Sequence, residues 1–542
     1  MRKPTLSRQL YPLHAGRGAF RRFLRGAALA LCGLGIAAAP GTAQAQDVPG
    51  GRPAFHDVGG RIMIDYSAFT LTSGGDFDLL GVHYLQNIND WLAFGVGASA
   101  PIAGGNYGGF FAADVTLHAQ RDIGRNFFVN AGLAVGAGAG GASVNGIRRL
   151  SGEGFYTRAY AGIGYHFRRF SAGVNYARVA IAGSELNDST LNFFVQVPFS
   201  FAVGRFADAG QVLTSDDFRA PQHQNIVSLQ FNHVQQINPT GLYQGTIGFA
   251  STQFTHFHTP NIYSYFGVDI GATGLLWYNQ AHGGIGGRVA LGRNVNLYAQ
   301  LGIGSGGWVT DTIDTGPGFI IYPKVTLEYL WGNGVGTTVS AGYFYAPFGT
   351  SRNWTVGVGL NYHLSHPERR GGGVLAGAEY TLRGIRLHTF GRVTSPIFYN
   401  GRESEGLTMV ALQADYMLND RWYLAGQIAA ATNAFRGFAG YAEGFFGAGW
   451  QTRPFAGGRL QGYAQVLYGL NDVGVDPARE VGALLYPSIG VNYYLNERVS
   501  IYGQLGATIS LGRYMNAAMT NSWRNTSIGL GMTYRFSLPT RS

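Results

Sequence analysis

The sequence predicts an all-β protein, a transmembrane antiparallel up-and-down β-barrel. Two observations lead to this prediction. Apolar residues recur at every second position over segments of about 10 to 13 residues, which is the length that a tilted strand needs to cross a bilayer. The connections between these segments alternate between tight turns and longer polar or glycine-rich stretches. That alternation is typical of barrels with turns on one side of a membrane and loops on the other.

The composition agrees with membrane strands and excludes a bundle of membrane helices. Of the 542 residues, 84 are glycine, 14% are aromatic and only 13% are charged, whereas a soluble domain is usually about a quarter charged. No apolar run of about 18 residues follows the first fifty positions, so no membrane helix is expected there. A soluble β-propeller or solenoid is the alternative. Propeller blades, however, bury both faces and lack the regular alternation of long and short connections.

Residues 1–45 are predicted to be a secretory signal peptide. A basic region without acids precedes the apolar run Gly26 to Ala39 and the small-residue site Ala43-Gln44-Ala45. Its removal takes away seven of the 39 basic residues and none of the 29 acids, so the formal net charge falls from +10 to about +3. Nucleic acid is therefore not expected as a partner. Cys32, the single cysteine, lies in the same segment, so no disulfide is expected.

A polar turn followed by an alternating strand occurs at least four times. The copies are YLQNINDWLAFGVGASA from Tyr84, ALGRNVNLYAQLGIGSG from Ala290, YMLNDRWYLAGQIAAAT from Tyr416 and YYLNERVSIYGQLGAT from Tyr493. Because side chains alternate across a strand, the apolar positions would face lipid and the polar positions the lumen. Such a lining would suit neutral polar cargo, although the same side chains could simply bond neighbouring strands. The candidate lumen-facing residues are Asn296, Tyr298, Gln300, Ser500, Tyr502 and Gln504.

The last predicted strand ends on an aromatic pair. Thr526 to Phe536 reads TSIGLGMTYRF, with apolar and polar positions alternating up to Phe536. This strand resembles the closing strand of Gram-negative outer-membrane β-barrel proteins, in which an aromatic-x-aromatic ending is read by the barrel assembly machinery. The family's final aromatic is often the last residue, whereas here six residues follow. The residues that match the closing-strand signal are Gly529, Gly531, Tyr534 and Phe536.

This resemblance covers nearly the whole mature chain at the level of class. It implies the cell outer membrane as the location, with outer-membrane lipid and the barrel assembly machinery as partners.

Strands of the closing type occur three times, which predicts an internal triplication. The earlier ones are LNFFVQVPFSF from Leu191 and WTVGVGLNYHL from Trp354. The expected organisation is a signal peptide at 1–45, barrel repeat units at 46–203, 224–365 and 366–536, a linker or loop at 204–223 and a short tail at 537–542.

Two architectures fit this triplication. One is a single large barrel of about 24 strands built from three eight-strand repeats, and the other is a series of tandem eight-stranded barrels. We expect the large barrel, because an eight-stranded interior has to be filled by side chains and the inward positions offer many Gly, Ala and Asn.

The large barrel predicts an outer-membrane pore or conduit for the passage or export of polar solutes or a polymer. The segment from Gln46 to Phe55 is too short for a plug, so long loops or another protein would have to narrow the lumen. A periplasmic or inner-membrane export partner is therefore possible. A structural or adhesive surface protein, working through its long loops, is an alternative.

An outer-membrane barrel enzyme of the protease or lipase type is the competing class. No catalytic residue, cofactor or metal is predicted, because an enzyme needs a nucleophile or activated water beside a base. Two histidines alone are too few ligands to predict a metal site. The paired acids lack the ligand spacing of a known calcium loop, so they are expected to lie in solvated turns. The residues considered were His256 and His258 with Asp216, Asp217 or His223 for a metal, and Asp76, Asp78, Asp311 and Asp314 for calcium.

Overall fold

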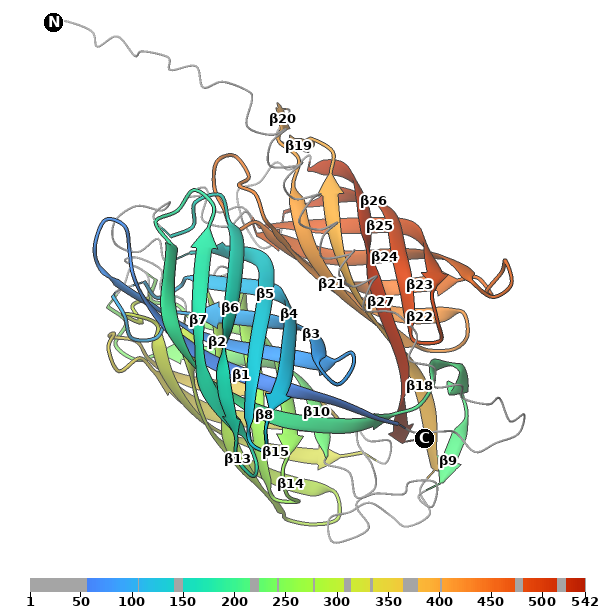
Figure 1. Cartoon of the computed structure of the whole chain (residues 1–542), viewed down its shortest axis with the longest axis horizontal. Helices are drawn as coiled ribbons and strands as arrows, with labels where there is room; N and C mark the ends of the chain where they lie inside the picture. The colour runs from blue at the N-terminus through green and yellow to red at the C-terminus, as the bar shows by residue number, and fades with distance from the viewer. Residues whose placement is uncertain are drawn as a thin grey trace, which may run out of the picture. The chain divides into compact units, whose positions relative to one another are not determined.

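The computed structural model describes residues 56–105, 107–140, 150–214, 224–240, 243–275, 278–306, 313–331, 335–363, 379–399, 402–472, 481–513 and 523–541. The predicted signal peptide at 1–45 lies outside these residues. The described residues form 27 strands and one short 3-10 helix (Figure 1). Among them, no helix has the length and apolar character that crossing a bilayer requires.

The first eight strands form a closed antiparallel barrel. Each strand pairs with the next, and β1 closes the ring by pairing with β8, from His56 opposite Val203 to Ser67 opposite Asn192. The strands are β1 His56–Thr70, β2 Asp76–Asn87, β3 Leu92–Ala100, β4 Phe111–Ile123, β5 Phe127–Ala139, β6 Phe155–His166, β7 Ser171–Ile181 and β8 Asn187–Val203.

A second closed barrel is formed by β10 to β17. Its seam joins β10 to β17, from Ile226 opposite His363 to Gln236 opposite Asn353. The strands are β10 Asn225–Gln236, β11 Ile247–Phe257, β12 Ile262–Thr273, β13 Asn279–Ala290, β14 Val295–Gly306, β15 Phe319–Leu330, β16 Val335–Tyr345 and β17 Arg352–His363.

The third barrel closes where β18 pairs with β27, from Tyr380 opposite Arg541 to Thr394 opposite Ser527. Its eight strands are β18 Glu379–Thr394, β21 Thr408–Met417, β22 Trp422–Ala431, β23 Ala442–Gln451, β24 Leu460–Asp472, β25 Val481–Tyr494, β26 Val499–Arg513 and β27 Arg524–Arg541.

Short elements extend the third sheet. After the 3-10 helix η1 Phe206–Asp208, β9 Val212–Thr214 pairs with the first residues of β18. The hairpin of β19 Ile397–Tyr399 and β20 Arg402–Ser404 lies in the connection between β18 and β21 and touches β27 at Arg524.

The structure therefore corrects the expectation of one large barrel of about 24 strands. Three closed eight-strand barrels are present, which is the tandem alternative. Strands β1 to β8 lie within the expected unit 46–203, and β10 to β17 lie within 224–365. The expected linker or loop at 204–223 contains η1 and β9. In the third unit the last strand continues past Phe536, because Ser537 to Arg541 pair with Tyr380 to Gly384.

The large-barrel expectation failed because inward glycines do not leave the lumen empty. Gly132 lies beneath the ring of Tyr160, Gly286 beneath Tyr263, and Gly449 beneath Tyr423, so that a Cβ at any of these glycines would overlap the ring. Each glycine is opposite or near its aromatic partner on an adjacent strand, and the ring crosses the space that a side chain would take. Small residues thus make room for large ones, and an eight-stranded interior is filled.

The repeated phrase of the sequence corresponds to a tight turn and the strand that follows it. In the turns before β3, β22 and β26, the side-chain oxygens of Asn89, Asn419 and Asn496 each accept hydrogen bonds from two backbone N–H groups, two and three residues further on. Asparagine favours this local turn because its side chain replaces a backbone acceptor. The same Asx-turn therefore starts strands in the first and third barrels.

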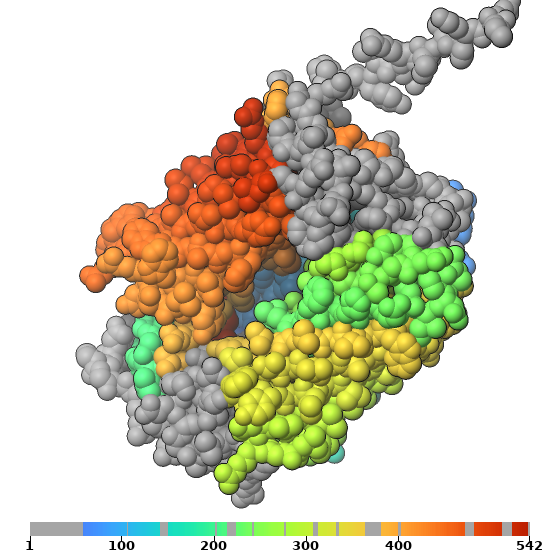
Figure 2. Space-filling view, turned by 180° about the vertical axis from the view of Figure 1, so that it is seen from behind, coloured from blue at the N-terminus to red at the C-terminus, as the bar shows by residue number. Residues whose placement is uncertain are grey.

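Apolar side chains cover the outer faces of the barrels. Leu133, Ile285 and Ile528, one from each barrel, are 52%, 68% and 64% exposed. In the space-filling view, closely packed side chains form the surfaces of the second barrel, green to yellow, and the third, orange to red (Figure 2). Exposed aliphatic side chains at this density are typical of strands that face lipid.

We predict that Gly449→Ala destabilises the third barrel, whereas Gly444→Ala on the same strand does not. A methyl group at 449 would overlap the Tyr423 ring, and nothing lies within 4 Å of a methyl group at 444. Overpacking of this kind costs about 1 to 3 kcal/mol. Urea unfolding of protein refolded into phosphatidylcholine vesicles measures the difference. Equal stability of the two variants would contradict the proposed role of Gly449.

Candidate functional site

Each barrel interior contains a buried carboxylate bonded to a histidine on the adjacent strand. All six side chains are nearly inaccessible to solvent. Ionised groups persist in such surroundings only when they are paired and hydrogen-bonded. The distances from carboxylate Oδ2 to imidazole Nε2 are 3.0 Å for Asp65 and His83, 3.2 Å for Asp269 and His282, and 2.8 Å for Asp415 and His388.

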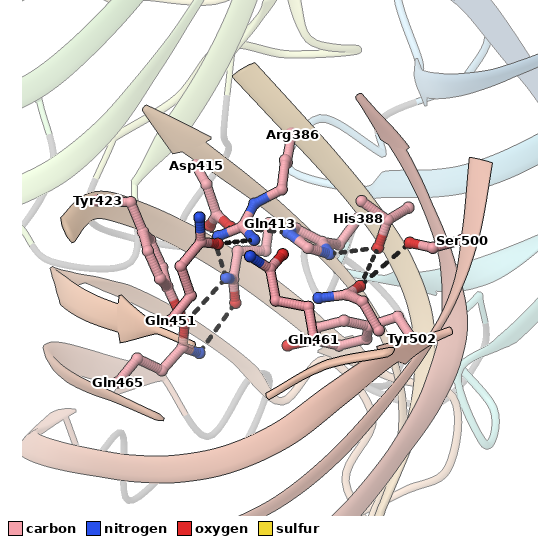
Figure 3. Close-up of polar contacts among 12 residues, drawn as sticks. Arg386, His388, Gln413, Asp415, Tyr423, Gln451, Gln461, Gln465, Ser500 and Tyr502 are labelled. Carbon is pink, nitrogen blue, oxygen red and sulfur yellow. Dashed lines mark hydrogen bonds and ion pairs between the residues drawn. The ribbon is translucent and has the colours of Figure 1, made fainter. Parts of the chain in front are cut away.

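Asp415 is the centre of the polar network in the third barrel (Figure 3). Its Oδ2 lies 2.8 Å from Nη2 of Arg386 and 2.8 Å from Nε2 of His388. Gln413, on the same strand, donates to its Oδ1 at 2.7 Å. One carboxylate thus meets a guanidinium, an imidazole and an amide, and its charge is compensated within the lumen.

The network continues from Arg386 across the lumen. Arg386 donates to Oε1 of Gln451 at 2.6 Å, and its guanidinium lies over the ring of Tyr423 at 4.6 Å. Gln465 exchanges hydrogen bonds with Gln413 at 3.0 and 3.1 Å and accepts one from Tyr423 at 3.1 Å. These side chains come from β18, β21, β22, β23 and β24, so the polar layer joins strands on different sides of the ring.

On its other side, His388 is linked to β27 and β25. Nδ1 of His388 lies 2.7 Å from Oγ1 of Thr533, and that hydroxyl lies 3.1 Å from Oδ1 of Asn492. Ser500 also donates to Asn492, at 3.2 Å. The Asp415, His388 and Thr533 chain has the order of an acid, a base and a hydroxyl, but all three groups are buried in the filled interior.

The first barrel compensates its buried charges in a similar way. Arg158 lies 2.7 Å from Oδ2 of Asp65 through Nη2 and 2.8 Å from Nε2 of His83 through Nη1. Asp114 lies 3.8 Å from Nδ1 of His83 and accepts a hydrogen bond from Thr116. Four charged or ionisable groups therefore meet inside one small lumen.

The second barrel places a glutamate among four donors. Glu328 accepts hydrogen bonds from Asn296 at 2.9 Å, Tyr298 at 2.6 Å and Asn361 at 2.8 Å, and lies 2.8 Å from Nε2 of His363. This side chain is completely buried. Both of its oxygens are thus used by the barrel wall, so the carboxylate holds β14, β15 and β17 together.

The six candidate lumen-facing residues are all buried in the barrel interiors. Asn296 and Tyr298 bond Glu328, and Gln300 exchanges hydrogen bonds with Gln253. In the third barrel Ser500 bonds Asn492, Tyr502 donates to Gln504 at 2.8 Å, and Gln504 donates to Tyr486 at 2.8 Å. Their polar groups are thus engaged with neighbouring side chains. A contact of any of them with a passing solute stays a prediction.

The four residues of the closing-strand signal lie along β27. Gly531 packs against the backbone of Thr389 and Phe390 on β18, and Gly529 lies near the Phe390 ring. The rings of Tyr534 and Phe536 are 5.8 Å apart. The two glycines let β18 approach β27 closely at the seam, and recognition by the assembly machinery stays a prediction.

Hydrophobic clusters cover the loop ends of the three interiors. Each cluster combines strand ends with loop residues, and its buried apolar side chains disfavour water at that end of the barrel. The members at the loop ends are Phe69, Leu71, Phe77, Tyr107, Phe110, Leu150, Ile181 and Leu186 in the first barrel, Val234, Ile247, Phe249, Leu275, Tyr278, Ile313 and Phe344 in the second, and Ile397, Leu407, Met409, Phe435, Tyr441 and Trp523 in the third.

Several of the residues considered for metals bond other groups of the protein. The rings of His256 and His258 are 5.0 Å apart. Nδ1 of His256 lies 2.8 Å from Asn225 and Nε2 of His258 lies 2.9 Å from Ser264. Asp78 accepts from the backbone N–H groups of Ile102 and Ala103, and Asp314 accepts from those of Gly316 and Thr350. In the described part of the chain no three His, Cys, Asp or Glu residues are grouped to hold a metal. Asp216, Asp217, His223 and Asp311 lie outside the described residues.

The interior ion pairs were not identified from the sequence. A usable signal exists, because Arg158 and Asp415 interrupt otherwise uncharged strands at the positions that alternate with lipid-facing residues. Asp65 also lies at such a position, on a strand that carries Asp57 and Arg61 as well. Their partners lie on other strands, so pairing them requires the strand register and the number of strands in the ring.

We predict that Asp415→Asn destabilises the third barrel more than the combined change of Arg386→Met and Asp415→Leu. The single variant leaves the Arg386 charge buried without its carboxylate, which typically costs about 3 to 5 kcal/mol, whereas replacing both charges by apolar groups is often nearly neutral. Equilibrium urea unfolding in phosphatidylcholine vesicles compares the variants. A single variant as stable as the unchanged protein would show that the pair does not hold this interior together.

Comparison with known proteins gives structural matches only. No protein-family model and no curated protein matches the chain. Solved structures from Pseudomonas aeruginosa do match. The outer membrane protein OpdK is 8% identical over 89% of this chain and 99% of its own, with a TM-score of 0.20. OpdQ is 9% identical over 89% and 97%, with a TM-score of 0.20. The siderophore receptor PirA is 9% identical over 90% and 81%, with a TM-score of 0.25.

These scores are too low to support an argument from any of these proteins to the present chain. The resemblance to Gram-negative outer-membrane β-barrel proteins is one of class and extends to no particular member.

Proposed function

We propose that the chain is an integral outer-membrane protein whose three barrels are sealed by their own side chains and whose working surface is formed by the loops. The observation that supports this proposal is the hydrophobic cluster at the loop end of each lumen. An eight-stranded ring is just wide enough to be filled by side chains. A structural or adhesive role at the cell surface fits such sealed barrels better than transport of a polymer does.

The wide conduit expected from the sequence depended on a single large ring. In the described residues, the polar layer of each barrel is crossed by arginine, tyrosine or glutamine side chains, such as Arg158, Tyr298 and Gln465. A polymer would have to displace both this layer and the hydrophobic cluster above it. Export of a polymer, with a periplasmic or inner-membrane partner, therefore has no support in the barrel interiors.

A narrow passage for water and small polar solutes is the second candidate. Asn130, Asn175 and Gln427 are buried, and both polar atoms of each side chain lack a hydrogen-bond partner among the described residues. Buried amides are normally satisfied by protein or by ordered water. Water inside the first and third barrels would satisfy them, so a solvated path would exist if the loop-end clusters moved aside.

The proposal includes neither catalysis nor a cofactor. His83, His282 and His388, each paired with a carboxylate, are buried in filled interiors, and a substrate would need access to them. His166 is 33% exposed and lies 3.0 Å from Oδ1 of Asp122 and 2.8 Å from Oγ of Ser171, and the proposal gives this pair no catalytic role. Outer-membrane lipid against the apolar outer faces and the barrel assembly machinery at β27 are the partners proposed.

Planar-bilayer recording tests the sealed state. The unchanged protein should give no large stepwise current, because the lumens are filled. Phe77→Ala combined with Phe110→Ala removes two rings from the first cluster, in which their centroids are 5.4 Å apart, and should give small steps if the solvated path exists.

Leu133→Ala combined with Ile163→Ala is the matched control, since both side chains are exposed on the outer face of the same barrel. This variant should remain silent. Heat-modifiable gel migration must first show that each variant is folded. Large steps from the unchanged protein would overturn the sealed-barrel proposal and restore the conduit.

A further inference from the structure

Three consecutive turns of the third barrel place an arginine at the same structural position. Arg421, Arg459 and Arg498 each directly precede the strand that leaves the turn, namely β22, β24 and β26. Their backbone carbonyls accept the N–H groups of Gln451, Tyr494 and Arg535 at 2.8 Å each. These bonds fix the three residues at the turn end of the barrel, and all three arginines are exposed. They are called the arginine ring below.

Among the turns that the structure describes, arginine occupies this position only in the third barrel. In the first barrel the matching carbonyls belong to Trp91 and Asn126, which accept from Gln120 and His166. In the second barrel they belong to Asn261 and Asn294, which accept from Arg288 and Leu330. None of these four counterparts in the described turns is charged. The repeated turn therefore does not itself require arginine at this position.

The middle turn of the ring is an extended hairpin. Its eight residues, from Thr452 to Arg459, read TRPFAGGR, and Phe455 and Leu460 form a β-bridge with bonds of 2.8 and 3.1 Å. Ala456, Gly457 and Gly458 have φ values of 52°, 69° and 83°, which the two glycines adopt without steric cost. The hairpin thus carries a further exposed arginine, Arg453, next to the ring.

Aromatic side chains give the depth of the ring relative to lipid. Residues directly opposite in antiparallel strands share a face. Phe455 is opposite Leu460, and Leu460 is opposite Tyr493. Because Tyr493 is exposed, all three lie on the outer face. Trp422 is opposite Trp450 on the same face. Trp422, Phe455 and Tyr493 are 52%, 49% and 39% exposed. Exposed aromatics at strand ends mark the membrane–water boundary.

The charge of these turns is positive. The three turns carry four arginines and two acids, which gives a net charge of +2. The arginines are Arg421, Arg453, Arg459 and Arg498, and the acids are Asp420 and Glu497. Among the described residues, none of these four arginines forms an ion pair within 4.0 Å. Turns two strands apart are about 10 Å from each other, so the guanidinium groups are spaced to meet separate headgroups rather than one small anion.

We infer that the arginine ring binds the headgroups of anionic phospholipids in the leaflet that faces the turns. Guanidinium groups donate paired hydrogen bonds to phosphate, and the aromatic residues beside the ring hold it at headgroup depth. A net positive cluster at this depth favours lipids with net negative charge over zwitterionic ones. This inference rests on the membrane-spanning placement proposed above.

Native mass spectrometry of the full protein, released from micelles containing equal amounts of phosphatidylglycerol and phosphatidylcholine, tests the inference. The unchanged protein should retain several-fold more phosphatidylglycerol than phosphatidylcholine. Combined Arg421→Gln, Arg459→Gln and Arg498→Gln should lower the retained phosphatidylglycerol to the level of phosphatidylcholine. The excess should also shrink as salt is raised, because exposed charges are screened.

A triple variant with the same charge change provides the control. Arg125→Gln, Arg168→Gln and Arg293→Gln remove three exposed arginines from turns of the first two barrels and should leave most of the excess. Equal losses in both triple variants, or no excess in the unchanged protein, would overturn the assignment. Heat-modifiable migration separates this failure from failure of the proposed function, because a chain without a membrane barrel would not show it.

Discussion

The closing of each sheet on itself is the constraint on which the rest of the structure depends. In hydrocarbon an unpaired strand edge leaves backbone N–H and C=O groups unsatisfied at several kcal/mol each. The ladders between β1 and β8, β10 and β17, and β18 and β27 remove those edges in three separate places. Closure after eight strands makes each lumen narrow, so its inward side chains must pack against one another across the interior.

The interiors meet that packing requirement with two kinds of contact. Rings lie over glycines of nearby strands, as Tyr423 does over Gly449, and arginines bridge carboxylates and amides, as Arg386 does between Asp415 and Gln451. The first contact fills volume, and the second neutralises charge where water is scarce. Together they explain how strands rich in glycine, alanine and asparagine still form filled barrels.

Local pattern in the sequence predicts much of the strand content but not the closure. Alternation in the segment from Val295 to Gly306 and the Asx-turn at Asn496 depend on neighbours in sequence, so both could be inferred. The partner of β1 could not, because β8 and a later strand with the same alternation would satisfy it equally. An inward glycine such as Gly132 leaves space only if the ring of Tyr160, its partner on β6, is not known to cover it. For the same reason, the alternation of side chains along β21 places Asp415 in the interior but does not reveal Arg386 as its partner.

The positions of the buried carboxylate and histidine pairs indicate that these pairs meet a physical requirement of each barrel and are not copies inherited with the repeat. In the first barrel the acid is on the first strand and the histidine on the second, and in the third barrel the two are exchanged. In the second barrel the pair lies on the third and fourth strands. A pair copied with the repeat would keep its strand positions. The common requirement is that a narrow lumen with one buried charge needs a partner within hydrogen-bond distance, and each barrel meets it with different strands.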